Sequence, residues 1–133
     1  MCIAVAMALA CSPLWAKKQK TQAGAVGANY IAALATANRF LSAWQSNDQE
    51  AGLLLLTDRA KHKSSEAGID TLFGGSSLRA FEIVRGRPLG NRRYEFPVVL
   101  LQATGESKQV HRKFTRIVVA NTGKNDWAVD TLP

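Results

Sequence analysis

The chain has 133 residues, of which 47% are hydrophobic and 20% are charged, and its formal net charge is +7. This composition is typical of a globular protein and excludes intrinsic disorder, while the length allows one domain and not two. A chain of this size can fold without a disulfide or a structural metal.

The first sixteen residues carry no charge and are almost wholly apolar. They are too short to span a bilayer as a helix, which needs about 20 residues, and they resemble the apolar core of a secretory signal that ends in small residues. No basic residue precedes them, so a start further upstream or an apolar helix packed on the domain are the alternatives. Cys11 follows Ala8, Leu9 and Ala10 in a pattern similar to a lipoprotein signal. We therefore expect an exported protein (periplasmic, secreted or envelope-associated) that is bound to a membrane only if Cys11 is lipidated.

Residues 17–29 are first polar and then rich in glycine and alanine, which predicts a flexible tether before a single domain at 30–133. Both cysteines, Cys2 and Cys11, lie in the predicted leader. The mature domain would have neither a disulfide nor a thiol nucleophile.

Three helices are predicted next. Apolar residues at helical spacing from Leu34 to Trp44 indicate a long amphipathic helix. Asn47 and Glu50 have the spacing of a capping box, which predicts a second, short helix through the leucines at 53–56. Ser64 or Ser65 can cap a third helix that ends at Gly74.

Strands follow at about 78–87, 92–103, 108–120 and 126–132, where the apolar residues alternate. The short turns between them predict an antiparallel meander, and Pro97 indicates a bulge, a bend or an edge position. The predicted fold class is α+β, with three N-terminal helices packed on the concave face of a curved four-stranded antiparallel sheet, as a cone or half-barrel.

The residues from Phe40 to Ala51, then Leu54 and Leu55, and the terminal residues 126–130 resemble the nuclear transport factor 2-like superfamily of cone-shaped α+β proteins, in particular its small exported bacterial members. The resemblance covers residues 30–132. It implies a relation to ketosteroid isomerase-like and dehydratase-like enzymes, and also to many non-enzymatic binding or assembly modules, so the fold does not fix the function.

Such a cone would enclose a pocket between its first helix and the inner face of its sheet. In the third strand we expect Phe114 and Val118 to point inward together with the neighbouring arginines. The candidate pocket residues are Trp44, Tyr94, Phe96, Arg112, Phe114, Arg116 and Trp127. The alternative is that the aromatic residues simply form the core. Both sheet faces are partly apolar, so we expect the outer face to be covered in a homodimer.

Catalytic residues are harder to find. His62 and His111 lie among polar residues, and Asp130 alternates with an inward Val129, so none faces the expected pocket. The sequence predicts no metal site and no cofactor. A basic patch at Arg85, Arg87, Arg92 and Arg93 is either a solvated face or a surface for an anionic polymer or lipid, and export argues against nucleic acid.

We therefore expect a non-enzymatic exported domain that binds a small apolar ligand or a protein partner. One alternative is an isomerase- or dehydratase-like enzyme that uses the cone pocket. The other is a module that binds anionic surfaces through its basic patch.

Overall fold

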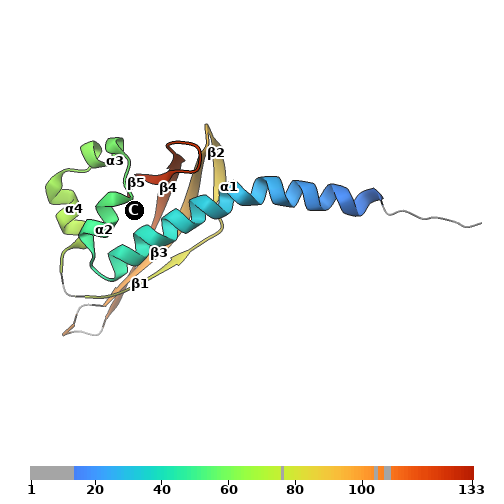
Figure 1. Ribbon diagram of the computed structural model, residues 1–133. Coiled ribbons are helices and arrows are strands. Elements are labelled where there is room, and N and C mark those ends of the chain that lie inside the picture. Colours follow the sequence, from blue (N-terminus) through green and yellow to red (C-terminus); the bar gives the residue numbers. More distant parts are fainter. Residues whose placement is uncertain (1–13, 76, 104, 107–108) are drawn as a thin grey trace, which may run out of the picture.

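The structure is a computed structural model that describes the backbone of residues 14–133 except 76, 104, 107 and 108, and the side chains from residue 27 onward with the same gaps. Its fold is mixed α+β, with an open, curved antiparallel sheet and helices packed on one face (Figure 1). The elements in chain order are α1 (Leu14–Gln45), α2 (Gln49–Leu54), α3 (Asp58–Lys63), α4 (Glu66–Phe73), β1 (Leu78–Ile83), β2 (Arg87–Gly90), β3 (Arg93–Ala103), β4 (Val110–Asn121) and β5 (Trp127–Thr131).

Helix α1 begins at Leu14, so residues 17–29, expected as a flexible tether, have helical backbone. Figure 1 shows this first part of the helix running beyond the sheet. Among the described side chains of α1, Tyr30 is the first aromatic one that packs on the sheet, and its ring centroid lies 5.5 Å from that of Phe96. Most of the predicted leader, including Cys11, lies outside the described residues. None of the helices among the described residues is long and apolar enough to cross a membrane.

The described residues form four helices where three were expected. Thr57 begins the additional helix α3, because its hydroxyl accepts a hydrogen bond from the Ala60 amide at 3.0 Å. The cap of α2 is Asp48 and not Asn47, whose φ of 58° is the left-handed conformation that asparagine tolerates. Ser65 caps α4, as predicted.

Within the described part of the chain the sheet has five strands where four were expected. Its order is β1-β3-β4-β5, and β2 pairs with β3 on the same edge as β1. Strand β2 forms because Asn91 and Arg92 both have positive φ, 51° and 56°, which closes a two-residue hairpin between Gly90 and Arg93. Pro97 lies between the last β1 pair and the first β2 pair, so the amide hydrogen that proline lacks falls at the break in this edge.

One strand has the predicted orientation and its neighbour does not. In β3 the inward phase through Phe96, Val98 and Leu100 is confirmed, since all three are buried. Phe96 pairs with Ile117 of β4, and directly paired residues of an antiparallel sheet point to the same face. The inner face of β4 therefore carries Ile117 and Val119.

The expectation that the alternate β4 residues point inward is wrong. Phe114, Val118, Arg112 and Arg116 belong to the other phase of the strand and lie on the outer face of the sheet.

The core between α1 and the sheet is filled by large side chains. Trp44 is only 1% exposed, and its indole nitrogen donates a hydrogen bond to the Leu72 carbonyl oxygen at 3.0 Å. Phe40 and Phe73 meet edge to face nearby, with centroids 5.9 Å apart. Trp44 therefore belongs to the core at the C-terminal end of α1.

Candidate functional site

The outer face of the sheet carries a group of apolar side chains that no described helix covers. Phe114, in the middle of β4, is 75% exposed, and its cross-strand partner Val99 is half-buried. Leu78 and Val110 are also largely exposed at the end of the same face. We call this the outer apolar patch, and its members are Leu78, Ala80, Val99, Leu101, Ala103, Val110 and Phe114. A monomer gains nothing from leaving so many apolar groups in water, so the patch indicates an interaction surface.

Charges of opposite sign flank the outer apolar patch. Glu82 on β1 lies in the same cross-strand row as Val99 and Phe114. On β4, Arg112 and Arg116 stand two residues before and after Phe114, on the same face. The patch is thus negative at its β1 side and positive at its β4 side.

Arg116, next to the patch, and Arg87 on β2 share one carboxylate, that of Glu95. Glu95 accepts from Arg87 at 3.1 Å and from Arg116 at 3.4 Å. The hydrogen bond from Arg87 is the main cause that holds the pKa of Glu95 below its ordinary value, and the charge of Arg116 acts in the same direction. Glu95 is therefore bound as a carboxylate between two cations.

Asp130 is held in a similar way. It is 8% exposed, and it accepts from Arg93 at 2.6 Å and from the Thr57 hydroxyl at 2.9 Å, with Arg59 at 4.0 Å. The sequence placed Asp130 facing outward, and the structure shows that Arg93 and the start of α3 bury it there. Its carboxylate ties β3, β5 and α3 together.

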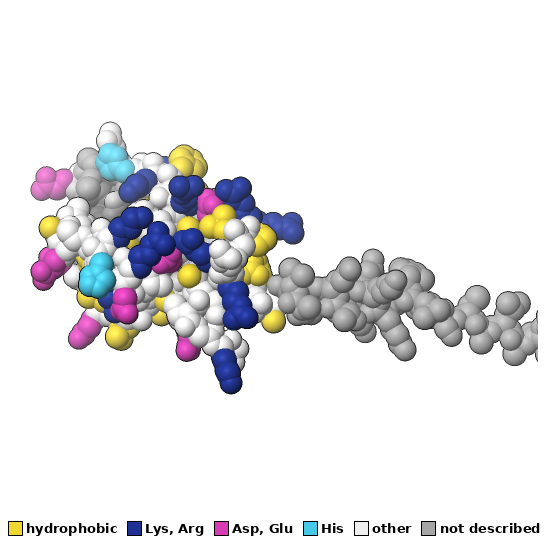
Figure 2. Space-filling view, turned by 90° about the horizontal axis from the view of Figure 1, so that it is seen from above, with side chains coloured by type: hydrophobic (Ala, Val, Ile, Leu, Met, Phe, Trp, Pro, Cys, Tyr) yellow, Lys and Arg dark blue, Asp and Glu magenta, His cyan; other side chains and the backbone are white. Residues whose placement is uncertain are grey.

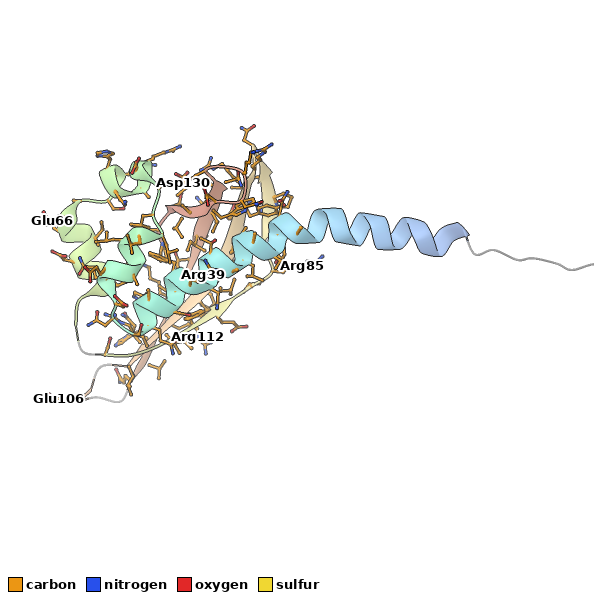
Figure 3. All side chains as sticks on the ribbon, in the orientation of Figure 1. Arg39, Glu66, Arg85, Glu106, Arg112 and Asp130 are labelled. Atoms are coloured by element: carbon orange, nitrogen blue, oxygen red, sulfur yellow. The ribbon has the colours of Figure 1, made fainter. Side chains whose placement is uncertain are left out.

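The predicted basic patch is only partly assembled. Figure 2 shows lysine and arginine side chains gathered on one face around a few acidic ones. Arg87 and Arg93 belong to the two ion-pair clusters, whereas Arg85 and Arg92 are exposed. Figure 3 shows Arg85 beside α1, well apart from Arg112.

The structure divides the predicted pocket residues into three separate places. Tyr94, Phe96 and Trp127 pack with Tyr30 on the inner face, with neighbouring centroids 5.5–6.4 Å apart. Trp44 lies 14 residues further along α1 than Tyr30, or about 21 Å along the helix axis. The remaining predicted residues, Arg112, Phe114 and Arg116, are on the outer face.

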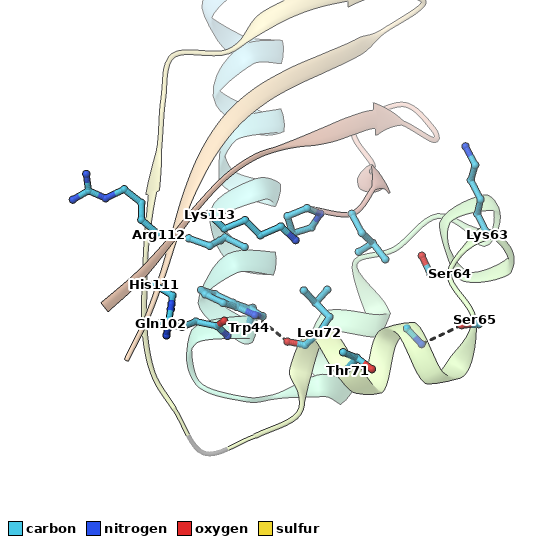
Figure 4. A pocket seen from close by; sticks show the side chains of 14 residues that line it. Trp44, Lys63, Ser64, Ser65, Thr71, Leu72, Gln102, His111, Arg112 and Lys113 are labelled. Atoms are coloured by element: carbon cyan, nitrogen blue, oxygen red, sulfur yellow. Dashed lines mark hydrogen bonds between the residues drawn. The ribbon is translucent and has the colours of Figure 1, made fainter. Parts of the chain in front are cut away.

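A cleft of about 570 Å³ opens at the Trp44 end, between α3 and α4 on one side and β3 and β4 on the other (Figure 4). Of the residues around this cleft, only Trp44 and Arg112 were predicted from the sequence as pocket residues. The alternation of β4 could have found Lys113, which is in phase with Ile117 and Val119. The lining residues are Trp44, Lys63, Ser64, Ser65, Gly68, Thr71, Leu72, Leu100, Gln102, His111, Arg112, Lys113, Leu132 and Pro133.

Comparisons of this chain with protein-family models, with curated proteins and with solved structures find no match. Among the described residues, no group of three or more histidine, cysteine or acidic side chains is placed to hold a metal ion.

Proposed function

We propose that this chain is a non-enzymatic assembly domain that docks a second copy of itself on the outer apolar patch. The observation that carries the proposal is Phe114, which is 75% exposed in the centre of β4. Strand β4 pairs with β3 from Val110 to Ala120, which fixes the face to which Phe114 points, while β5 pairs with β4 only from Val118 to Asn121. A continuous apolar surface on a paired strand suits a folded protein partner.

The flanking charges favour a second copy as that partner. A two-fold axis running along β3, in the plane between two facing sheets, places β1 of one copy over β4 of the other. Glu82 of one copy then faces Phe114 of the other copy, and Arg112 and Arg116 of that other copy lie on either side. The same contact forms twice, as a symmetric interface requires.

The charged groups of the described part support assembly over acid–base catalysis. Glu95 and Asp130 are each bound by arginines, and neither faces the cleft at Trp44. The cleft contains no aspartate or glutamate, and its one histidine, His111, is exposed. A catalytic base would need to be held facing its substrate.

We further propose that the protein is exported and that its fold is a variant of the nuclear transport factor 2-like cone. The apolar leader supports export. The break in the chain after α1, the order of helices before strands and the antiparallel curved sheet support the fold relation.

Sedimentation equilibrium of the full chain over a range of concentrations, under reducing conditions, tests the assembly. We expect a reversible dimer for the natural chain. Phe114→Lys should weaken it at least about tenfold, because burying an unpaired charge in an apolar interface is costly.

Leu54→Lys is the matched control, since Leu54 is 81% exposed but lies on α2, among the helices. It should leave the dimer unchanged. A natural chain that stays monomeric at every concentration, or a Leu54→Lys effect as large as that of Phe114→Lys, would refute the proposal.

A further inference from the structure

The cleft at Trp44 lies on the inner side of the sheet, away from the outer apolar patch. Its sheet wall is set by the pairing of β3 with β4, in which Leu100 faces Lys113 and Gln102 faces His111. Leu100 is buried on the inner face, so its partner Lys113 projects from the same face. Figure 4 shows Lys113 reaching into the cleft, whereas Arg112 points away from it.

The charged side chains that line this cleft are cationic. Lys113 stands on the sheet wall, and Lys63 stands at the helical side. No aspartate or glutamate side chain lines the cleft, and Lys113 forms no ion pair with any residue that the structure describes. A concave site lined by cationic side chains concentrates anions.

Polar groups opposite the lysine could complete the binding of an anion. Ser64 is half-buried in the cleft, and its hydroxyl has no hydrogen bond within the described part of the chain. Gln102 is half-buried on the sheet wall, paired with His111. Thr71 and Ser65 have hydroxyls already engaged with the backbone of α4, so they hold that wall in place.

The floor of the cleft is apolar and rigid. Trp44 is fixed by its hydrogen bond to the Leu72 carbonyl oxygen, and the side chains of Leu72 and Leu100 also line the cleft. A ligand that fits must therefore combine an anionic group with an apolar body. A volume of about 570 Å³ is in the range of sites for small organic molecules.

From these contacts we infer that the cleft binds a small organic anion, a carboxylate or a phosphate monoester. Its anionic group lies between Lys113 and Ser64, and its apolar body lies against Leu72, with the buried Trp44 beneath. This site is separate from the outer face and does not depend on self-association.

Titration of the full-length, ¹⁵N-labelled chain with benzoate, phenyl phosphate and neutral benzyl alcohol tests the site. We expect both anions to shift the amide signals of Leu72, Gln102 and Lys113, and the neutral probe to bind at least about tenfold more weakly, as loss of a charged hydrogen bond implies. Binding of both anions, or of only one, supports the proposal and identifies the class of anion.

Lys113→Gln should weaken the binding of the anions about tenfold and leave benzyl alcohol unaffected. Lys124→Gln, which removes an exposed lysine from the turn before β5, is the matched control and should change neither. Phe114→Lys should bind the anions as the natural chain does, which keeps this test independent of the dimer. Equal binding of charged and neutral probes, equal effects of the two lysine variants, or shifts confined to another surface would overturn the inference.

Discussion

Arg79 is a buried arginine that holds the ends of two helices. It is 7% exposed on the inner face of β1, and its guanidinium donates to the carbonyl oxygens of Trp44 (2.9 Å), Phe73 (3.2 Å) and Gly74. It also lies over the Trp44 ring, 5.3 Å from the centroid. These carbonyls end α1 and α4, where the helix dipoles favour a cation. Arg79 thus joins two helices to the sheet edge.

Replacing Arg79 should cost more than replacing any exposed arginine. Arg79→Met leaves the Phe73 and Gly74 carbonyl oxygens without the Arg79 donor, while the Trp44 carbonyl oxygen keeps the Asn47 amide at 3.2 Å. We expect a loss of about 2–4 kcal/mol in the free energy of unfolding. Arg39→Met on the exposed side of α1 should change it by less than about 0.5 kcal/mol. Urea unfolding of both variants measures the difference, and equal midpoints would show that the buried contacts of Arg79 do not stabilise the fold.

Arg79 also marks a limit of prediction at the residue scale. The sequence places it among several arginines of the strand region, and nothing local separates it from Arg85 or Arg87. Its role depends on carbonyls that are 5 to 35 residues away along the chain. Caps such as Ser65 could be predicted because their partner is three residues away.

At the scale of elements, alternating apolar residues predict that a strand is present better than they predict which face of the sheet each side chain points to. Strand β4 is apolar in both phases around Phe114, Ile117 and Val118, so the pattern alone fits either face. Pairing with β3 decides between them, and a shift of one residue would reverse every side chain. The short elements α3 and β2 escaped prediction because a single cap and a two-residue turn define them. As a result, the predicted pocket combined residues from opposite faces of the sheet.

The orientation of β4 can be checked by two truncations on the same strand. Ile117→Ala removes a fully buried side chain and should destabilise the monomer by about 2–5 kcal/mol. Phe114→Ala removes a larger but exposed ring and should cost less than about 1 kcal/mol. Urea unfolding at protein concentrations too low for a dimer measures the loss of stability of each variant. A larger loss for Phe114→Ala would mean that Phe114, and not Ile117, faces the core.

At the scale of the whole molecule, the two faces of the sheet have different chemistry. The inner face buries a continuous aromatic and aliphatic core against α1, and at its Trp44 end it forms the cationic cleft. The outer face combines the outer apolar patch with two arginine–carboxylate clusters. This division follows from a single layer of helices on one face, which leaves the other face uncovered by any described helix.

The most direct measurement of the central claim is an isotope-filtered NMR experiment on a mixture of labelled and unlabelled full-length chains. We expect cross-peaks between the Phe114 ring of one copy and the Val99 and Leu101 methyl groups of the other, since a two-fold axis along β3 brings these rows together. Cross-peaks between copies that arise only from another surface, or none at concentrations near a millimolar, would contradict it.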